Sequence, residues 1–129
     1  MKKKGILNRD ISSVLAKLGH TDQIVIADCG LPIPDGVPCI DLSLELGDPT
    51  FLRTLDVVLA DMEVEKGIVA KEIKMRNAQM CETIQQYEFP IEYVDHERLK
   101  KQSQTAKAVI RTGETTPYAN IILQAGVIF

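Results

Sequence analysis

The stretch LGHTDQIVIADCGLPIPDG, residues 18–36, combines a helix end, a buried strand and a stiff loop. Gly19 follows an amphipathic segment, which predicts a helix ending in a left-handed glycine cap. Residues 23–27 are too few for a helix and too uniformly apolar for a half-exposed strand, so they indicate a strand covered on both faces. Asp28 follows at the carboxyl end, where open α/β sheets bind ligands, and two prolines restrict the next loop. The stretch therefore predicts one wall of a ligand site.

The rest of the chain alternates between helical and strand-like segments. Helical spacing or capping signals predict helices from the cap Asn8 to about residue 18, from Asp48 or Thr50 to 62, over 77–87 and over 95–105. Short apolar runs predict strands over 38–42, 66–70, 91–94 and 107–111, and strand-like segments over 118–123 and 127–129. This alternation implies right-handed crossovers. We expect a single α/β domain over residues 1–129, a three-layer fold with a mostly parallel sheet covered by helices on both faces.

Composition limits the classes of function. The 129 residues carry a formal net charge of −3, and the only basic run is the three lysines at 2–4, which argues against nucleic acid as a partner. No apolar region follows these lysines, so they do not start a signal peptide, and no segment is long enough to span a membrane. We expect no membrane association and a cytoplasmic location.

Several signatures of catalysis and of metal binding are absent from the chain. It has no G-x-G-x-x-G, P-loop or G-x-S-x-G motif, and its three cysteines lack C-x-x-C spacing, so reduced thiols are expected. Cys29 as a nucleophile is disfavoured because the adjacent Asp28 would oppose thiolate formation. A metal site formed by His20, Asp28 and His96 is a weak alternative, and we expect no metal and no cofactor.

Five polar residues at the ends of predicted elements remain as candidates: His20, Asp28, His96, Tyr118 and Asn120. Each also has a purely structural explanation. The histidines could complement a helix dipole or flank a cap, and the aspartate could form a turn. The last two residues are two apart on a predicted strand and would share one face, either in solvent or in a pocket wall.

The apolar C-terminal residues are unusual, because chain ends are normally polar and frayed. Residues 125–129 read Ala-Gly-Val-Ile-Phe. Such an end indicates either a central strand or a contact between subunits.

Motifs along the whole chain resemble the ribose pyranase/fucose mutarotase family, and within it the ribose pyranases rather than the fucose mutarotases. They are LGHTD at 18–22, IVIAD at 24–28, GLPIPDG at 30–36, IDLSL at 40–44, IRTGE at 110–114 and TPYAN at 116–120. The starting MKK and the final LQAGVIF fit as well. Fucose mutarotases are similar around the Gly-His and Ala-Asp pairs but differ in the loop after the aspartate.

The resemblance implies an isomerase that interconverts the β-pyranose and β-furanose forms of D-ribose and supplies the furanose to ribokinase. It implies that His20 is the proton donor and that Asp28, His96, Tyr118 and Asn120 bind the sugar. It also implies a cytosolic homodecamer.

The implied reaction requires only proton transfers, because the hemiacetal must open and then close again through another hydroxyl. A free imidazole titrates near ~6.5, so a histidine can give or take a proton at neutral pH. However, His20 and Asp28 flank a strand that keeps them upward of ~15 Å apart. We therefore expect a site shared between subunits. The alternatives are a non-catalytic sugar-binding or transport-accessory protein, and a mutarotase for fucose or another sugar.

Overall fold

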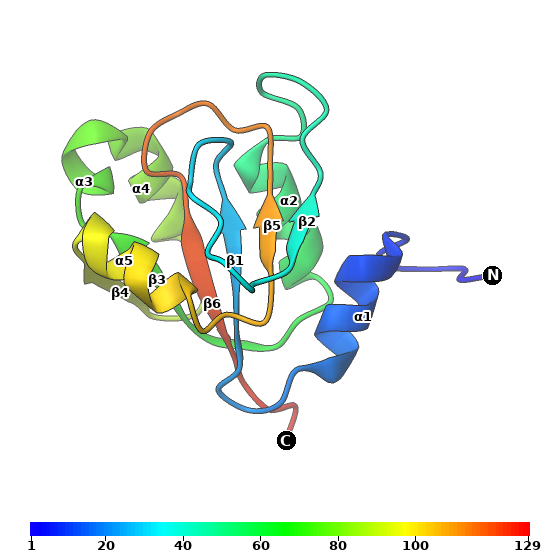
Figure 1. Cartoon of the computed structure of the whole chain (residues 1–129). Coiled ribbons are helices and arrows are strands. Elements are labelled where there is room, and N and C mark those ends of the chain that lie inside the picture. The colour runs from blue at the N-terminus through cyan, green and yellow to red at the C-terminus, as the bar shows by residue number, and fades with distance from the viewer.

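Six strands form one sheet in the order β2-β5-β1-β6-β3-β4 in the computed structural model, which describes residues 1–129 (Figure 1). The strands are β1 (Gln23–Ala27), β2 (Cys39–Asp41), β3 (Val64–Ala70), β4 (Ile91–Val94), β5 (Val109–Arg111) and β6 (Ile121–Ala125). Pairs β1·β5, β2·β5 and β3·β4 are parallel, whereas β6 runs antiparallel between β1 and β3. The prediction of a mostly parallel α/β sheet is confirmed.

Five helices connect the strands: α1 (Arg9–Lys17), α2 (Phe51–Leu59), α3 (Ile73–Arg76), α4 (Ala78–Ile84) and α5 (His96–Ser103). Side chains of Asn8, Thr50 and Asp95 accept backbone N–H bonds at the starts of α1, α2 and α5, as the sequence predicts. The sequence did not predict α3, because one helical turn is too short to show a periodicity. None of the helices is both long and apolar enough to cross a bilayer.

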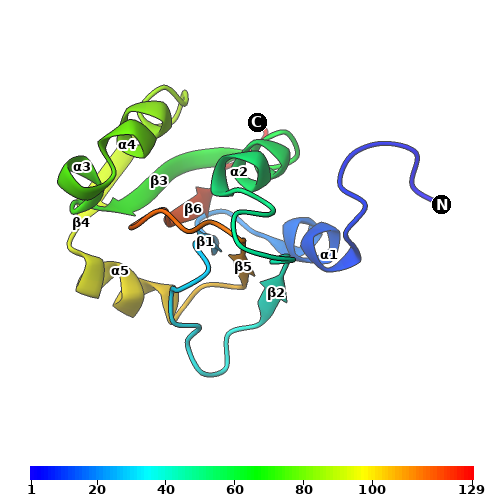
Figure 2. The same ribbon diagram turned by 90° about the horizontal axis from the view of Figure 1, so that it is seen from above.

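Helices cover both faces of the sheet (Figure 2). Ile24 and Ile26 of β1 pack into a core shared with α1, α2, α3 and α4, whereas Val25 and Ala27 pack on the opposite face with Leu99 of α5. These four side chains of β1 are fully buried. Successive strand residues point to opposite faces, so a uniformly apolar strand requires this double cover. The three-layer prediction is confirmed.

Two predictions about the ends of elements are wrong. The left-handed residue after α1 is Thr21, with φ 73°, because Leu18 is already extended and the Asp22 carboxylate accepts the Gly19 N–H. Likewise Tyr118 is not in a strand. It takes φ 58° in the turn that precedes β6, and its carbonyl accepts the Asn120 N–H at 2.9 Å.

The C-terminal segment has a buried part and an exposed part. Strand β6 is central, and its residues Ile121, Ile122 and Leu123 are fully buried. Residues 127–129 form no strand, and Ile128 and Phe129 are more than 90% exposed. The final side chains therefore contribute nothing to the core of their own chain.

Candidate active site

The first group of candidate residues, here called the Asp28 cluster, comprises Asp28, His96, Tyr118 and Asn120. Asp28 directly follows β1, and Asn120 directly precedes the antiparallel β6, so the two residues meet at one edge of the sheet. Asn120 Oδ1 accepts the Asp28 N–H at 2.8 Å, and Asn120 Nδ2 donates to Asp28 Oδ2 at 3.0 Å. The other carboxylate oxygen of Asp28 accepts the Gly30 N–H at 2.9 Å. The carboxylate is therefore fixed in orientation.

His96 and Tyr118 bring two rings to the same edge. His96 is the first residue of α5 and is separated from β4 only by the N-cap Asp95. Its ring meets the Tyr118 ring edge-on, with centroids 5.1 Å apart at 85°. Glu72 Oε2 accepts the His96 backbone N–H at 2.8 Å. Two polar atoms of this pair, Glu72 Oε1 and His96 Nδ1, are buried without a hydrogen-bond partner. Such atoms are rare inside proteins.

Two further side chains hold the loops around this edge. The Arg111 guanidinium donates to the Cys29 carbonyl at 3.0 and 3.2 Å, and to Asp41 and Ser43 at 3.0 and 2.6 Å. The buried Glu114 accepts the Phe51 N–H at 3.0 Å with one oxygen and the Thr116 hydroxyl at 2.9 Å with the other. These contacts tie the loops that carry Asp28 and Tyr118 to β2 and α2.

His20 lies in a different environment, on the loop between α1 and β1. Its Nε2 is 2.8 Å from Glu65 Oε2 of β3. Gln124 of β6 donates to Glu65 Oε1, and Gln23 donates to Gln124 Oε1 at 2.8 Å. Hydrogen bonds from Gln124 and then from His20 hold the pKa of the Glu65 carboxyl below its ordinary value of 4.5. The candidate proton donor therefore contacts an ionised carboxylate at neutral pH.

His20 precedes β1 and Asp28 directly follows it, so His20 and the Asp28 cluster lie at opposite ends of this central strand, whose course Figure 1 shows. Five strand residues alone span about 16 Å. One chain therefore cannot bring His20 and Asp28 to the same pentose. No group of three or more histidine, cysteine or carboxylate side chains is arranged to hold a metal ion, so His20, Asp28 and His96 do not form the alternative metal site within a chain.

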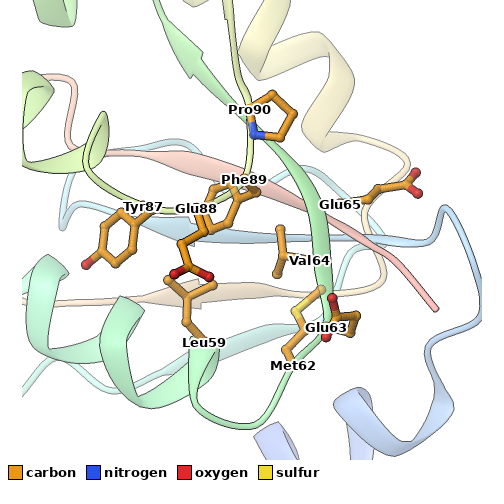
Figure 3. Close-up of a pocket in the computed structure, with 9 residues that line it drawn as sticks. All are labelled: Leu59, Met62, Glu63, Val64, Glu65, Tyr87, Glu88, Phe89 and Pro90. Carbon is orange, nitrogen blue, oxygen red and sulfur yellow. The ribbon is translucent and has the colours of Figure 1, made fainter. Parts of the chain in front are cut away.

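A surface hollow with a volume of about 510 Å³ is lined by Glu65, the partner of His20, and by no residue of the Asp28 cluster (Figure 3). Its lining residues come from the end of α2, the start of β3 and the loop before β4: Leu59, Met62, Glu63, Val64, Glu65, Tyr87, Glu88, Phe89 and Pro90. Glu65 stands at its edge, on the side away from Leu59 and Tyr87. Four further surface hollows are likewise lined by none of the five candidate residues.

Sequence reasoning missed Glu65, Glu72, Gln124, Arg111 and Glu114. Their partners are distant in sequence, since His20 and Glu65 are 45 residues apart and Glu65 and Gln124 are 59 apart. Glu72 did carry one signal that could have been used, because it follows the predicted buried strand over 66–70 just as Asp28 follows β1.

Comparison with known proteins identifies the family. The sequence model of the RbsD / FucU transport protein family matches residues 1–128. The chain belongs to this family. Among RbsD / FucU relatives, the D-ribose pyranase of Halalkalibacterium halodurans is 59% identical over 129 residues and that of Bacillus cereus strain G9842 is 58% identical over 131 residues. Each alignment covers the whole of both chains.

Solved structures of RbsD / FucU members have the same fold. Bacillus subtilis RbsD complexed with D-ribose superposes with a TM-score of 0.97 at 56% identity over 100% of both chains. The fucose mutarotase from Streptococcus pneumoniae in complex with L-fucose superposes with a TM-score of 0.73 at 27% identity over 95% of each chain. The family resemblance predicted from the motifs is confirmed, and the chain is closer to the ribose-binding member of these two.

Proposed function

We propose that the protein is a D-ribose pyranase, an isomerase that interconverts the β-pyranose and β-furanose forms of D-ribose. The observation that carries this proposal is the match to Bacillus subtilis RbsD, which was solved with D-ribose, at 56% identity over the full length of both chains. The curated relatives named D-ribose pyranase agree with it at 59% and 58% identity. The fucose mutarotase, at 27% identity, is a more distant relative.

In this proposal His20 is the proton donor, and Asp28, His96, Tyr118 and Asn120 bind the sugar. The contact of His20 with Glu65 supports a role in proton transfer, because a histidine beside a carboxylate is held in one orientation. The fixed Asp28 carboxylate and the Asn120 amide support a role in binding, because sugars are selected by hydrogen bonds of defined direction.

The chemistry needs only these groups. Opening the hemiacetal requires one proton given to the ring oxygen and one taken from the anomeric hydroxyl, and closing it through another hydroxyl reverses the two transfers. No electron sink, phosphate or metal is part of this reaction, so we propose that it proceeds without a cofactor. General acid–base catalysis supplies roughly 10²–10⁴-fold, which suits a reaction that already proceeds in water.

We further propose that the active site is shared between subunits of a homodecamer. His20 of one subunit would lie against the Asp28 cluster of its neighbour, since β1 separates the two groups within a chain. The exposed apolar end at Ile128 and Phe129 supports close association. We place the enzyme in the cytoplasm, where its furanose product would be available to ribokinase.

Saturation-transfer NMR on equilibrated D-ribose tests the function. The wild-type protein should accelerate exchange between pyranose and furanose signals, and His20→Ala should return exchange to the buffer rate while keeping measurable binding of ribose. A wild-type protein that binds ribose but leaves exchange at the buffer rate would instead be a sugar-binding or transport-accessory protein, a class in line with the family's description as transport proteins. The same measurement with L-fucose tests the alternative substrate.

A further inference from the structure

A chain of hydrogen bonds crosses three inner strands at the end of the sheet near His20. It starts at Gln23 on β1, passes through Gln124 on β6 and Glu65 on β3, and ends at the His20 ring. These residues come from three adjacent strands and one loop, so the sheet itself fixes their spacing. The side chain of His20 is 54% exposed and that of Glu65 is 35% exposed, which leaves the ring open to a molecule bound from outside.

The chemistry of the partners determines where the protons lie. An ionised carboxylate only accepts hydrogen bonds, so His20 Nε2 must carry the proton in its bond to Glu65. In the neutral ring the other nitrogen, Nδ1, is then the one with the free lone pair. Gln124 has a fixed orientation for the same reason, because its amide nitrogen faces Glu65 and its oxygen faces Gln23.

We propose that Glu65 is a positioning residue for His20, that it selects the tautomer protonated on Nε2, and that Nδ1 is therefore the nitrogen that exchanges the proton with the sugar. This inference rests on the proposed function and names a residue and an atom that the function alone does not require. Gln124 supports it by holding the second oxygen of the carboxylate.

The proton balance of the step is simple. The doubly protonated His20 ring gives its Nδ1 proton to the ring oxygen of the pyranose, and the bond between that oxygen and the anomeric carbon breaks. The anomeric hydroxyl loses its proton to a basic side chain of the Asp28 cluster, Asp28 or His96, and its oxygen becomes the carbonyl oxygen of the aldehyde, so one proton enters the sugar and one leaves it. Throughout the step Nε2–H stays bonded to Glu65, whose negative charge compensates the positive charge of the ring.

The charged residues next to this pair in the chain are Lys66 on β3 and Asp22 on the loop before β1. Lys66 lies next to Glu65 on β3 and bonds to Glu92 of β4 at 3.0 Å. Asp22, on the same loop as His20, accepts the Gly19 N–H and lies 3.8 Å from Lys107 Nζ. Lys66 and Asp22 each lie close to an oppositely charged side chain of their own. Glu65 is therefore the charged side chain that contacts the His20 ring.

Three variants of the full-length protein test the proposal. Glu65→Ala removes both the acceptor and the charge. Glu65→Gln keeps an acceptor for Nε2–H but removes the charge, and it can be accommodated if Gln124 and Gln23 reverse their amides. Glu63→Gln is the matched control, because Glu63 is exposed and its side chain makes no hydrogen bond. Exchange rates from saturation-transfer NMR give kcat and KM, and ¹⁵N NMR of the His20 ring gives the tautomer.

We expect Glu65→Ala to lower kcat by about tenfold with KM within about twofold, a loss comparable to one charge-assisted hydrogen bond. Its ¹⁵N spectrum should show a mixture of tautomers in place of the Nε2–H form. Glu65→Gln should keep the Nε2–H form and lose less activity, and Glu63→Gln should behave as wild type. If Glu65→Ala fails to fold, Gln124→Ala should show the same changes at smaller size.

Two results would overturn the proposal: a wild-type His20 ring protonated on Nδ1, or a folded Glu65→Ala protein with unchanged kcat. Failure of the proposed function looks different, because the wild-type protein would then not accelerate ribose exchange at all.

Discussion

Asn120 makes two hydrogen bonds to Asp28: its Oδ1 accepts the Asp28 backbone N–H at 2.8 Å, and its Nδ2 donates to Asp28 Oδ2 at 3.0 Å. These two hydrogen bonds join the end of β1 to the start of β6 and hold the Asp28 carboxylate at this end of the sheet. Asn120 is 1% exposed, so neither partner atom can be replaced by bulk water without rearrangement.

Replacing Asn120 by Ala should weaken both folding and ribose binding. The unpaired Asp28 groups should cost about 1–3 kcal/mol of unfolding free energy, and KM for ribose should rise because the carboxylate loses its orientation. Denaturant unfolding and NMR exchange rates measure the two effects. Asn8→Ala is the matched control, because Asn8 also makes two hydrogen bonds, to the backbone of α1, far from the cluster. That variant should cost about 1 kcal/mol and leave KM unchanged. Equal KM changes in both variants would contradict the assignment.

Glu72 should determine where the His96 ring sits. Glu72→Ala leaves the first N–H of α5 without its acceptor and should lower kcat/KM by about tenfold, whereas Glu72→Gln retains an acceptor and should recover most of that loss. Melting temperatures check that both variants fold. A Glu72→Gln protein as impaired as Glu72→Ala would show that the carboxylate acts in some way other than by holding this N–H.

Gly113 should tolerate no side chain. A Cβ at this position would lie 2.5 Å from the Asp48 carbonyl oxygen and 2.6 Å from the Glu45 carbonyl oxygen, and backbone atoms cannot move aside cheaply. We expect Gly113→Ala to destabilise the protein by about 2 kcal/mol in denaturant unfolding. Gly19→Ala is the control, since its Cβ would meet nothing closer than 3.6 Å, and it should unfold like wild type. A stable Gly113→Ala protein would mean that the loop around Asp48 adapts easily.

Tyr87 should make stability fall at alkaline pH. Burial, and then the hydrogen bond to Asp56, raises the pKa of the Tyr87 phenol well above its ordinary value of 10.0. The folded state therefore keeps a proton that the unfolded state loses, so the contribution is complete below pH 10.0 and disappears as the pH rises beyond it. Unfolding free energies measured against pH should fall less steeply above this value for Tyr87→Phe. Parallel curves for the two proteins would refute this linkage.

A site shared between subunits should show complementation. His20→Ala and Asn120→Ala proteins, each impaired alone, should regain activity when refolded together, because some sites then combine an intact His20 with an intact Asp28 cluster. Random mixing in a ring of identical contacts makes roughly a quarter of the sites intact. Co-refolding either variant with itself is the control. Mixed oligomers without any gain in exchange rate would place both groups in one subunit's site.

Much of the fold could be predicted from the sequence because the relevant signals are local. The apolar run of β1 requires cover on both faces, and Asn8, Thr50 and Asp95 cap helices through bonds to residues two or three positions away. The same locality placed Asp28 at a strand end and His96 at a helix start. The error at Tyr118 has a local cause too, since alternation of residue types does not reveal a left-handed turn at a non-glycine residue.

The sequence by itself determined the α/β class, the covered β1 and the five candidate residues, because periodicity, caps and motifs are written in neighbouring residues. Only the tertiary structure decided that β6 lies antiparallel between β1 and β3 and thereby joins Asn120 to Asp28 and Gln124 to Glu65. It also decided that His20 contacts Glu65 at the edge opposite the Asp28 cluster. Contacts between residues 45 to 92 positions apart depend on strand order, and strand order follows from how the whole core packs.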